Sequence, residues 1–380
     1  MKNKYFLSFI FFINFFTFSF NVKATPDSFA DLVEELLPAV VSIASTTIVE
    51  NKNNQPMPRF PEGSPFDEFF KEYFAPELKR RVEARTDHTM SVTELYSASA
   101  VKVTETLEGL QKGVIDIGGG CYCFEAAKLP LHAFQVWTPF GPFSPIKSLA
   151  VARDVYSTTP ELIDVFEKKY NQKLIGLIVL DPYEIVARKP LLKLSDLKGY
   201  KIGAAGANLA WLKGTGAVPV QTNGAIAYTS MQTGVFDAVV AFASFVEAAK
   251  FYEMAPHYMK IGIGSVTWLF VHINLDTYNK FPPEIRKIID EIGRDYETVV
   301  AMDKEESYLP TLQRMADKGT TIHELSAETK AEWAESLKGL PAAKAKEFDA
   351  KGYPATATIK RSLASAEKHG HVWPVKYKLD

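Results

Sequence analysis

The sequence predicts a two-lobed α/β protein, and three observations support this prediction. The chain has 380 residues, enough for two or three domains, and its 47% hydrophobic and 23% charged residues are typical of a folded globular protein. Short apolar runs alternate with helical stretches along most of the chain, as in α/β architecture. One sequence unit also occurs twice, which suggests two lobes of related build.

The N-terminus is typical of a secretory signal peptide. Lys2 and Lys4 precede an apolar run over residues 5–20, and Val22 and Ala24 suit cleavage after residue 24. The run is shorter than the ~20 residues that a transmembrane anchor needs, so we favour a cleaved signal peptide over residues 1–24. This predicts an exported protein.

Residues 25–66 differ in pattern from the rest of the chain. Residues 28–37 predict a short amphipathic helix, 39–49 are β-branched and predict a strand, and 51–65 form a linker rich in Pro, Asn and Gly. Apolar residues then recur at helical spacing over 66–81.

The remaining elements are predicted from apolar periodicity. We expect strands at 113–117, 174–180, 201–205, 238–242 and 266–273, and helices at 99–111, 160–170, 224–233, 244–252, 283–318 and 327–338. The stretch 283–318 is long for one helix, and Pro310 is a candidate break.

A helix–Gly–Val–x–Asp–strand unit occurs twice. Residues 110–116 read LQKGVID and residues 231–237 read MQTGVFD. In each copy a helix ends at a glycine, which suits a position of positive φ, and an apolar strand comes next. A common helix end could occur twice by chance, but the shared residues and the shared role favour two related lobes.

Composition argues against several other classes. A formal net charge of −2 does not fit a globally basic nucleic-acid binder. Cys121 and Cys123 are too close for an easy mutual disulfide and do not make a zinc site, so we expect packed free thiols. Residues 118–120, three glycines after a strand, lack the Lys-Ser/Thr of a phosphate loop. We therefore expect no cofactor and no metal.

Four segments carry a family resemblance: LEGLQKGVID at 107–116, LSDLKGYKIGAA at 194–205, GAVPVQTNGAIAYTSMQTGVFD at 216–237 and FPPEIRKIID at 281–290. From about residue 69 onward the chain resembles the solute-binding proteins of tripartite ATP-independent periplasmic (TRAP) transporters, the DctP-like family. The resemblance implies a type II-like periplasmic substrate-binding fold with an interlobe cleft, crossing strands and a long connecting helix, closing by hinge motion.

The resemblance also implies the division of the chain and its partners. Lobe I is expected at 67–174 plus 262–290, and lobe II at 175–261 plus 291–380. The implied location is the periplasm of a Gram-negative bacterium. The implied partners are a small organic acid and the TRAP membrane permease subunits, with no nucleic acid and no enzyme activity.

The family's carboxylate clamp is missing from its usual places. An arginine normally stands in the strand after the LKG turn, where its planar fork pairs with a carboxylate, but this chain has Gly203 there. A second anchor, usually asparagine, falls near Ala241 and Phe242. Simple C4-dicarboxylates are therefore less expected as ligands.

Aromatic and amide side chains stand near these places instead. The predicted ligand-binding residues are Tyr122, Tyr183, Asn208, Trp211, Phe242 and Trp268. They favour a relatively apolar or aromatic organic acid, or a larger neutral ligand. Two alternatives stay open: the aromatic rings as core residues, and Asn208 as a cap of the helix after it.

Residues 1–74 show a second resemblance. SFADLV at 28–33, LPAVV at 37–41 and PEGSPFDEFFK at 61–71 resemble the mature N-terminus of HtrA/Do-type periplasmic serine proteases. No protease nucleophile motif occurs after them. We interpret the chain as a chimera and expect the strand at 39–49 to fill the first strand position of lobe I. The alternatives in function are a protease fragment fused to a non-functional binding domain, and a periplasmic sensor or scavenger.

Overall fold

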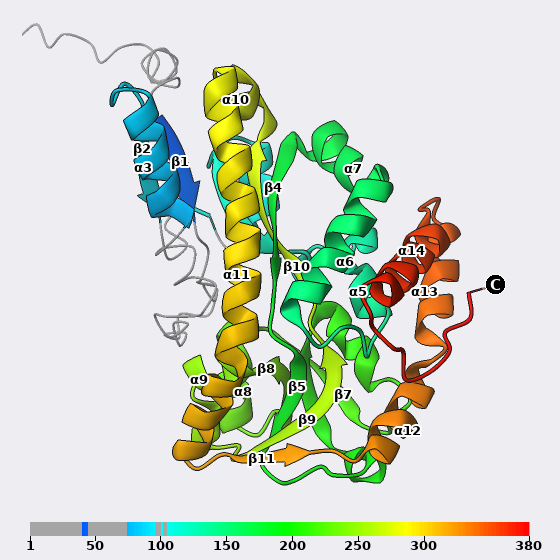
Figure 1. The fold of residues 1–380 in the computed structure, drawn as a ribbon. Coiled ribbons are helices and arrows are strands. Elements are labelled where there is room, and N and C mark those ends of the chain that lie inside the picture. Colours follow the sequence, from blue (N-terminus) through cyan, green and yellow to red (C-terminus); the bar gives the residue numbers. More distant parts are fainter. Residues whose placement is uncertain (1–39, 45–73, 96–99, 102–104, 380) are drawn as a thin grey trace, which may run out of the picture. The chain divides into compact units, whose positions relative to one another are not determined.

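The computed structural model describes residues 40–44, 74–95, 100–101 and 105–379, with only the backbone for 40–44 (Figure 1). The expected signal peptide lies outside the described residues, as do the 28–37 helix and the 51–65 linker. None of the described helices is long and apolar enough to cross a membrane.

The first sheet has the strand order β2-β1-β3-β10-β4. Its strands are β1 (Val40–Ala44), β2 (Ser91–Leu95), β3 (Ile117–Cys121), β4 (Gln172–Val179) and β10 (Thr267–Asn274). Strand β1 pairs in parallel with β2 and β3, whereas β10 is antiparallel to β3 and β4. The expectation that a strand from residues 39–49 enters this sheet is therefore confirmed over residues 40–44.

The second sheet has the order β11-β9-β5-β8-β6-β7. Its strands are β5 (Tyr183–Ala187), β6 (Lys201–Ala205), β7 (Val218–Thr222), β8 (Ala238–Phe242), β9 (His257–Gly264) and β11 (Thr321–Glu324). Strand β5 runs antiparallel to both of its neighbours, β8 and β9, while β6, β7 and β8 are parallel.

Three connections join the two sheets. The chain passes from the first sheet to the second between β4 and β5, and returns between β9 and β10. The long helix α11 (Pro283–Asp317) packs its first half on the core of the first sheet and its last turns on the core of the second (Figure 1). Pro310 lies within this helix without ending it. The two-lobed α/β fold is thus confirmed, with crossing strands and a long connecting helix.

The other helices cover the sheets. They are α3 (Ala75–Arg85), α4 (Thr106–Gln111), α5 (Phe134–Trp137), α6 (Pro145–Thr158), α7 (Glu161–Tyr170), α8 (Gly224–Gln232), α9 (Ala243–Ala248), α10 (Leu275–Lys280), α12 (Ala327–Leu337), α13 (Leu340–Asp349) and α14 (Ala355–Lys368). Short 3₁₀ helices are η3 (Tyr122–Phe124), η4 (Pro130–Ala133), η5 (Leu194–Leu197), η6 (Gly206–Leu212) and η7 (Phe251–Glu253).

The C-terminal helices α13 and α14 pack against helices from residues 134–158. Helix α14 lies against α5 and α6, and α13 lies against α14 and α5. Asp154 of α6 accepts hydrogen bonds from Ser365 and Lys368 of α14. The division into residues 67–174 plus 262–290 and 175–261 plus 291–380 stays a prediction; β4, as a whole, belongs to the first sheet.

The repeated unit has one geometry in both copies. Gly113 and Gly234 have φ values of 67° and 77°. The N–H of Gly113 donates to Leu110 O at 3.1 Å, and that of Gly234 donates to Met231 O at 3.0 Å. The next N–H reaches back to the preceding turn in both, so each helix ends in a Schellman motif. One copy leads to β3 in the first sheet and the other to β8 in the second, which supports two lobes of related build.

The glycine run and the cysteines lie at the end of β3. A side chain at Gly120 would overlap the Phe270 ring, with its Cβ 2.6 Å from Cζ, so glycine here allows close strand packing. Cys121 and Cys123 form a disulfide, and the expectation of free thiols was wrong. The chain turns into η3 at this point, which brings the two Cα atoms to 5.1 Å, within the range that a disulfide spans.

Candidate ligand-binding site

Four of the predicted site residues form one aromatic cluster centred on Tyr183. The Tyr183 ring meets Trp211 edge-on at 5.2 Å between centroids, Phe242 at 5.4 Å and Trp268 at 6.2 Å. Edge-to-face packing at such distances is favourable beyond the burial of area alone. The cluster joins strands of both sheets, because Trp268 comes from β10 and Tyr183 from β5.

Strand register explains the meeting of these rings. Tyr183 begins β5 and Phe242 ends β8, and the two residues are direct partners across the antiparallel pair. Side chains at paired positions share one face of a sheet. Both residues also lie where the chain enters or leaves the second sheet, next to the crossing from β4. The cluster therefore lies at the connection between the lobes. Tyr183, Trp211 and Trp268 are buried there as part of the hydrophobic core, with Phe242 packed against them, so their role as core residues is confirmed and a ligand-binding role stays a prediction.

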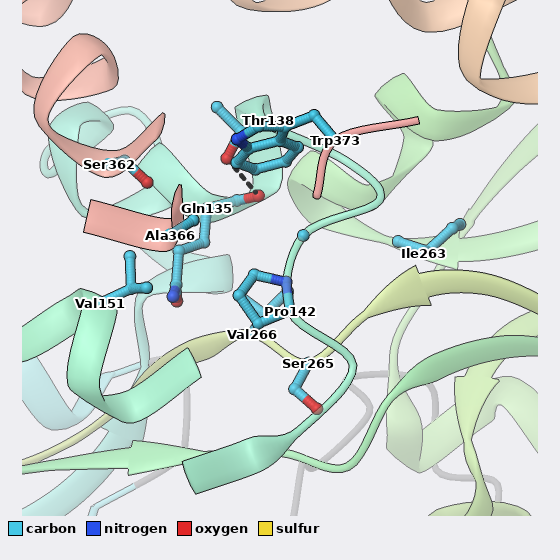
Figure 2. A pocket seen from close by; sticks show the side chains of 11 residues that line it. Gln135, Thr138, Pro142, Val151, Ile263, Ser265, Val266, Ser362, Ala366 and Trp373 are labelled. Carbon is cyan, nitrogen blue, oxygen red and sulfur yellow. Dashed lines mark hydrogen bonds between the residues drawn. The ribbon is translucent and has the colours of Figure 1, made fainter. Parts of the chain in front are cut away.

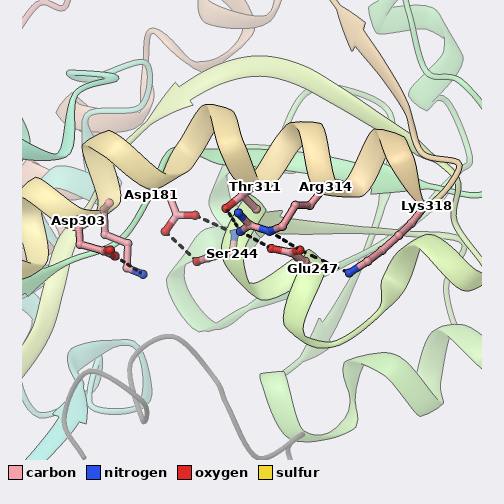
Figure 3. Close-up of polar contacts among 8 residues, drawn as sticks. Asp181, Ser244, Glu247, Asp303, Thr311, Arg314 and Lys318 are labelled. Atoms are coloured by element: carbon pink, nitrogen blue, oxygen red, sulfur yellow. Dashed lines mark hydrogen bonds and ion pairs between the residues drawn. The ribbon is translucent and has the colours of Figure 1, made fainter. Parts of the chain in front are cut away.

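Asp181 links the segment before Tyr183 to the segment after Phe242. Its buried carboxylate accepts hydrogen bonds from the N–H of Ser244 at 2.8 Å and from its hydroxyl at 2.9 Å, as Figure 3 shows. Helix α9, which begins beside Ser244, is in turn held to α11 by the ion pair of Glu247 with Arg314 (Figure 3). The cluster is thus tied to the helix that connects both lobes.

Asn208 lies in η6, directly after β6, and is 1% exposed. The start of η6 has no side-chain cap and Asn208 lies inside this helix, so the structure excludes the capping role. Burial raises the pKa of the neighbouring Tyr183 hydroxyl, and its proximity to Trp268 and Asn208 partly offsets this effect. Neither contact has the geometry of a formed hydrogen bond among the described residues, because Asn208 and the indole nitrogen of Trp268 both lack partners there.

Trp211 and Gly206 fix η6 against residues that come after β3. The Trp211 indole N–H donates to Val136 O at 2.8 Å. Gly206 has a φ of 50°, and a Cβ there would lie 2.5 Å from Cys123 O. Any larger residue at 206 would push η6 away from this contact, and glycine is also the residue that tolerates such a φ.

Tyr122 does not join the aromatic cluster. Its hydroxyl lies 3.1 Å from Nε2 of His272, whose Nδ1 lies 2.8 Å from Oε1 of Gln172. Burial lowers the pKa of His272 well below its usual value, so the ring is neutral. The Tyr122 ring also stacks on Phe270 in the core. A ligand-binding role for Tyr122 stays a prediction, and its contacts are those of a core residue.

A pocket with about 360 Å³ of water-accessible space lies beside the start of η6. Gly206 and Ala207 line one part of it, and Trp137 lines another. Lys344 and Lys351 of the C-terminal helices also line it and both pair with Glu347, at 2.8 and 2.9 Å. Two cations facing one carboxylate leave a net positive charge. Sequence reasoning missed this pocket, because its lysines lie far from η6 along the chain.

A second, enclosed pocket is too small for an organic ligand. It holds about 10 Å³ of water-accessible space, enough for about one water molecule. Gln135, Thr138, Ser265 and Ser362 provide polar groups around it, beside Trp373 (Figure 2). We therefore assign this pocket to the packing of the fold and not to ligand capture.

Two lobes joined by crossing strands, with aromatic and polar side chains gathered at the crossing, define a two-lobed solute-binding protein. The chain belongs to the bacterial extracellular solute-binding protein family 7, the DctP family, whose sequence profile matches residues 67–347. The proteins of this family are periplasmic receptors for transport rather than enzymes. The resemblance of residues 1–74 to a protease is not addressed by this match, and most of that segment lies outside the described residues.

One curated relative is similar over most of the chain. The C4-dicarboxylate-binding periplasmic protein DctP of Rhodobacter capsulatus is 28% identical over 272 residues, which is 69% of this chain and 79% of that protein. A solute-binding protein of Sulfitobacter sp. is 25% identical over 136 residues, 35% of this chain and 41% of that protein.

Solved structures show the same fold at low identity. DctP7 of Bordetella pertussis, a receptor that binds pyroglutamic acid, is 18% identical with a TM-score of 0.70, covering 87% of this chain and 99% of that one. A marine metagenome TRAP solute-binding protein from an unidentified microbe, specific for aromatic acids, was crystallised with 3-hydroxybenzoate. It is 19% identical with a TM-score of 0.72, covering 88% of this chain and 99% of that one.

Proposed function

We propose that this chain is the periplasmic receptor of a TRAP transporter and captures a small, relatively apolar or aromatic organic acid. The observation that carries the proposal is the Tyr183–Trp211–Phe242–Trp268 cluster at the crossing between the lobes, with Asn208 beside it. Gly203 in place of the clamp arginine argues against simple dicarboxylates, because no bidentate partner stands there.

A positively charged pocket wall is available to bind the acid group of the ligand. Lys344 and Lys351 line the pocket that also includes Gly206 and Ala207, the two residues before Asn208. Lys344 lies over the Trp137 ring at 4.8 Å, so its ammonium group is held at the pocket wall. We assign the carboxylate of the ligand to this side of the site. Delivery to TRAP membrane subunits, after export through a signal peptide cleaved behind Ala24, completes the proposed function.

The test is a thermal melt of the exported protein with aromatic, α-keto and C4-dicarboxylic acids. A ligand at 100 times its Kd that binds only the folded state adds ~2.7 kcal/mol of stability. We expect the aromatic or other apolar acids to raise the melting temperature and succinate to leave it unchanged. No shift with any acid would contradict the proposal, and a shift with succinate alone would contradict the ligand class.

A matched pair of variants locates the site. Trp268→Phe alters the cluster, whereas Trp373→Phe alters a partly buried tryptophan that packs against His371 and Tyr377 in the C-terminal segment. Trp268→Phe is expected to weaken binding of the responding acid, and Trp373→Phe to leave it unchanged. Equal effects of the two substitutions would place the ligand elsewhere.

Mass spectrometry of the periplasmic form checks the export step, with Thr25 as the expected first residue.

A further inference from the structure

The carboxamide of Asn208 is buried without a hydrogen-bond partner. Within the part of the chain that the structure describes, neither its Nδ2 nor its Oδ1 is hydrogen-bonded, and the side chain is 1% exposed. The indole Nε1 of Trp268, equally buried, is also unpartnered there. Buried polar groups in native proteins are nearly always paired, because leaving them unpaired costs free energy. These three atoms lie around the Tyr183 hydroxyl, which is near both side chains without a formed hydrogen bond to either, so one partner from outside the chain would satisfy all three.

The donors and acceptors of the cluster define what that partner offers. Asn208 presents two N–H donors and one carbonyl acceptor side by side, and Trp268 adds one donor. The other cluster residues, Tyr183, Trp211 and Phe242, carry no charge. A carboxylate has acceptors only, so it would leave Oδ1 of Asn208 unpaired. A group with a carbonyl oxygen and an N–H on one edge satisfies both sides of the Asn208 amide, and its carbonyl has a second lone pair for Trp268.

We propose that the ligand carries an unsubstituted amide or lactam edge, held by Asn208 and Trp268, in addition to its acid group. This inference rests on the proposed function and names the ligand class of the same site. The amide edge lies against Asn208 in the uncharged aromatic cluster, and the acid group lies toward the lysine-lined pocket beside Gly206 and Ala207.

The first test compares ligands that differ at this edge alone. Isothermal calorimetry measures 5-oxopyrrolidine-2-carboxylate against its N-methyl derivative and against 3-oxocyclopentanecarboxylate, which keep the carbonyl and lack the N–H. A second set compares 3-carbamoylbenzoate with 3-acetylbenzoate. We expect at least one amide to bind at least about 30-fold more tightly than its analogue, since the analogue leaves a buried acceptor unpaired. A preference below about threefold in both sets would overturn the inference.

The second test separates a ligand group from a structural one. Asn208→Leu removes the unpaired amide, so the ligand-free protein is expected to melt at the same or a higher temperature, while the preference for the amide disappears. The control is Asn274→Leu, because buried Asn274 donates to Leu110 O at 2.7 Å and accepts from the Thr277 N–H at 2.9 Å. This control is expected to lower the melting temperature.

The two proposals fail in different ways. If Asn208→Leu lowers the ligand-free melting temperature as much as Asn274→Leu does, Asn208 is a structural hydrogen-bonding residue and the amide assignment falls. If organic acids bind without regard to the amide, the assignment also falls and the receptor function stands. If no acid binds, with or without an amide, both fall.

Discussion

The connecting helix α11 packs so closely on β4 that one added methyl group at the contact is expected to push the two elements apart. Glycine faces glycine at this contact: a Cβ at Gly176 would lie 3.2 Å from Gly293 O. A Cβ at Gly293 would overlap both Cγ2 and the carbonyl oxygen of Ile175 and would lie 3.0 Å from its carbonyl carbon. The perturbation that tests this contact is Gly293→Ala.

Two opposing effects decide the result. Alanine in a helix interior is more favourable than glycine by about 1 kcal/mol. Overpacking costs about 1–3 kcal/mol, and here the obstacle is backbone that cannot rotate away. The helix must therefore shift, and a shift strains the bond from the Leu177 N–H to the buried Glu297 carboxylate, now 2.6 Å long. Bonds to charged groups contribute about 1.5–3 kcal/mol, so we expect a net loss of about 2–3 kcal/mol.

Denaturant unfolding measures this loss, with Gly339→Ala as the matched control. Gly339 has a φ of −81° and a Cβ there meets no atom within 4 Å. Alanine is expected to leave stability unchanged or to raise it by a few tenths of a kcal/mol at position 339. If Gly293→Ala unfolds at the same denaturant concentration as Gly339→Ala, the tight helix–sheet contact has no energetic weight and the reasoning is refuted.

Three further predictions concern pH and strand order. Burial raises the pKa of Glu184 to about 8 against an ordinary 4.5, so the folded state keeps a proton that the unfolded state releases, and stability falls as pH rises from 4.5 to 8. In Glu184→Gln this loss of stability, about 5 kcal/mol in total, is expected to vanish in unfolding curves taken across that range. Burial lowers the pKa of His132 to about 4 from 6.5, so stability falls as pH drops from 6.5 to 4. His132→Gln should remove about 3 kcal/mol of this acid loss in the same assay, and an unchanged acid limb would contradict it. Ser42→Pro interrupts β1 between two partner strands and should lower the melting temperature strongly, since proline disrupts central strands; an unchanged melt would mean that β1 does not stabilise the sheet.

Local patterns predicted much of the fold, with clear limits. Strands β6 and β8 match their predicted ranges residue for residue, because each is an apolar run with turn signals on both sides. The strand expected at 113–117 begins instead at Ile117, because the Schellman turn at Gly113 occupies the residues before it. The glycine-rich residues 118–120 carry no strand signal of their own; strand pairing with β10 gives them that structure.

Only part of the candidate site could be predicted from the sequence. Tyr183, Phe242, Trp211 and Trp268 could be proposed from their residue types near the expected ligand positions, and the structure brings them together. The position of Tyr122 could not be predicted from the sequence, because its contacts with Phe270 and His272 in the first-lobe core depend on long-range packing.

The position of Glu184 could not be inferred from the sequence either. One oxygen of its carboxyl group accepts the N–H groups of both Ile261 and Gly262, in a stretch where β9 departs from regular pairing with β5. The free N–H groups of such a bulge become available only once the two strands are paired, and they leave no pattern in the residue types.

The strand order of the first sheet determines when during synthesis the first lobe can form. Strand β1 comes from residues 40–44, whereas β10, the partner of both β3 and β4, is made only at residues 267–274. The pairs of β10 with β3 and β4 therefore wait until more than two thirds of the chain has been translated, and such long-range pairing is also slow. Strands β5 to β9, which all belong to the second sheet, precede β10 in the chain, so the first lobe is completed only after most of the second sheet has been made.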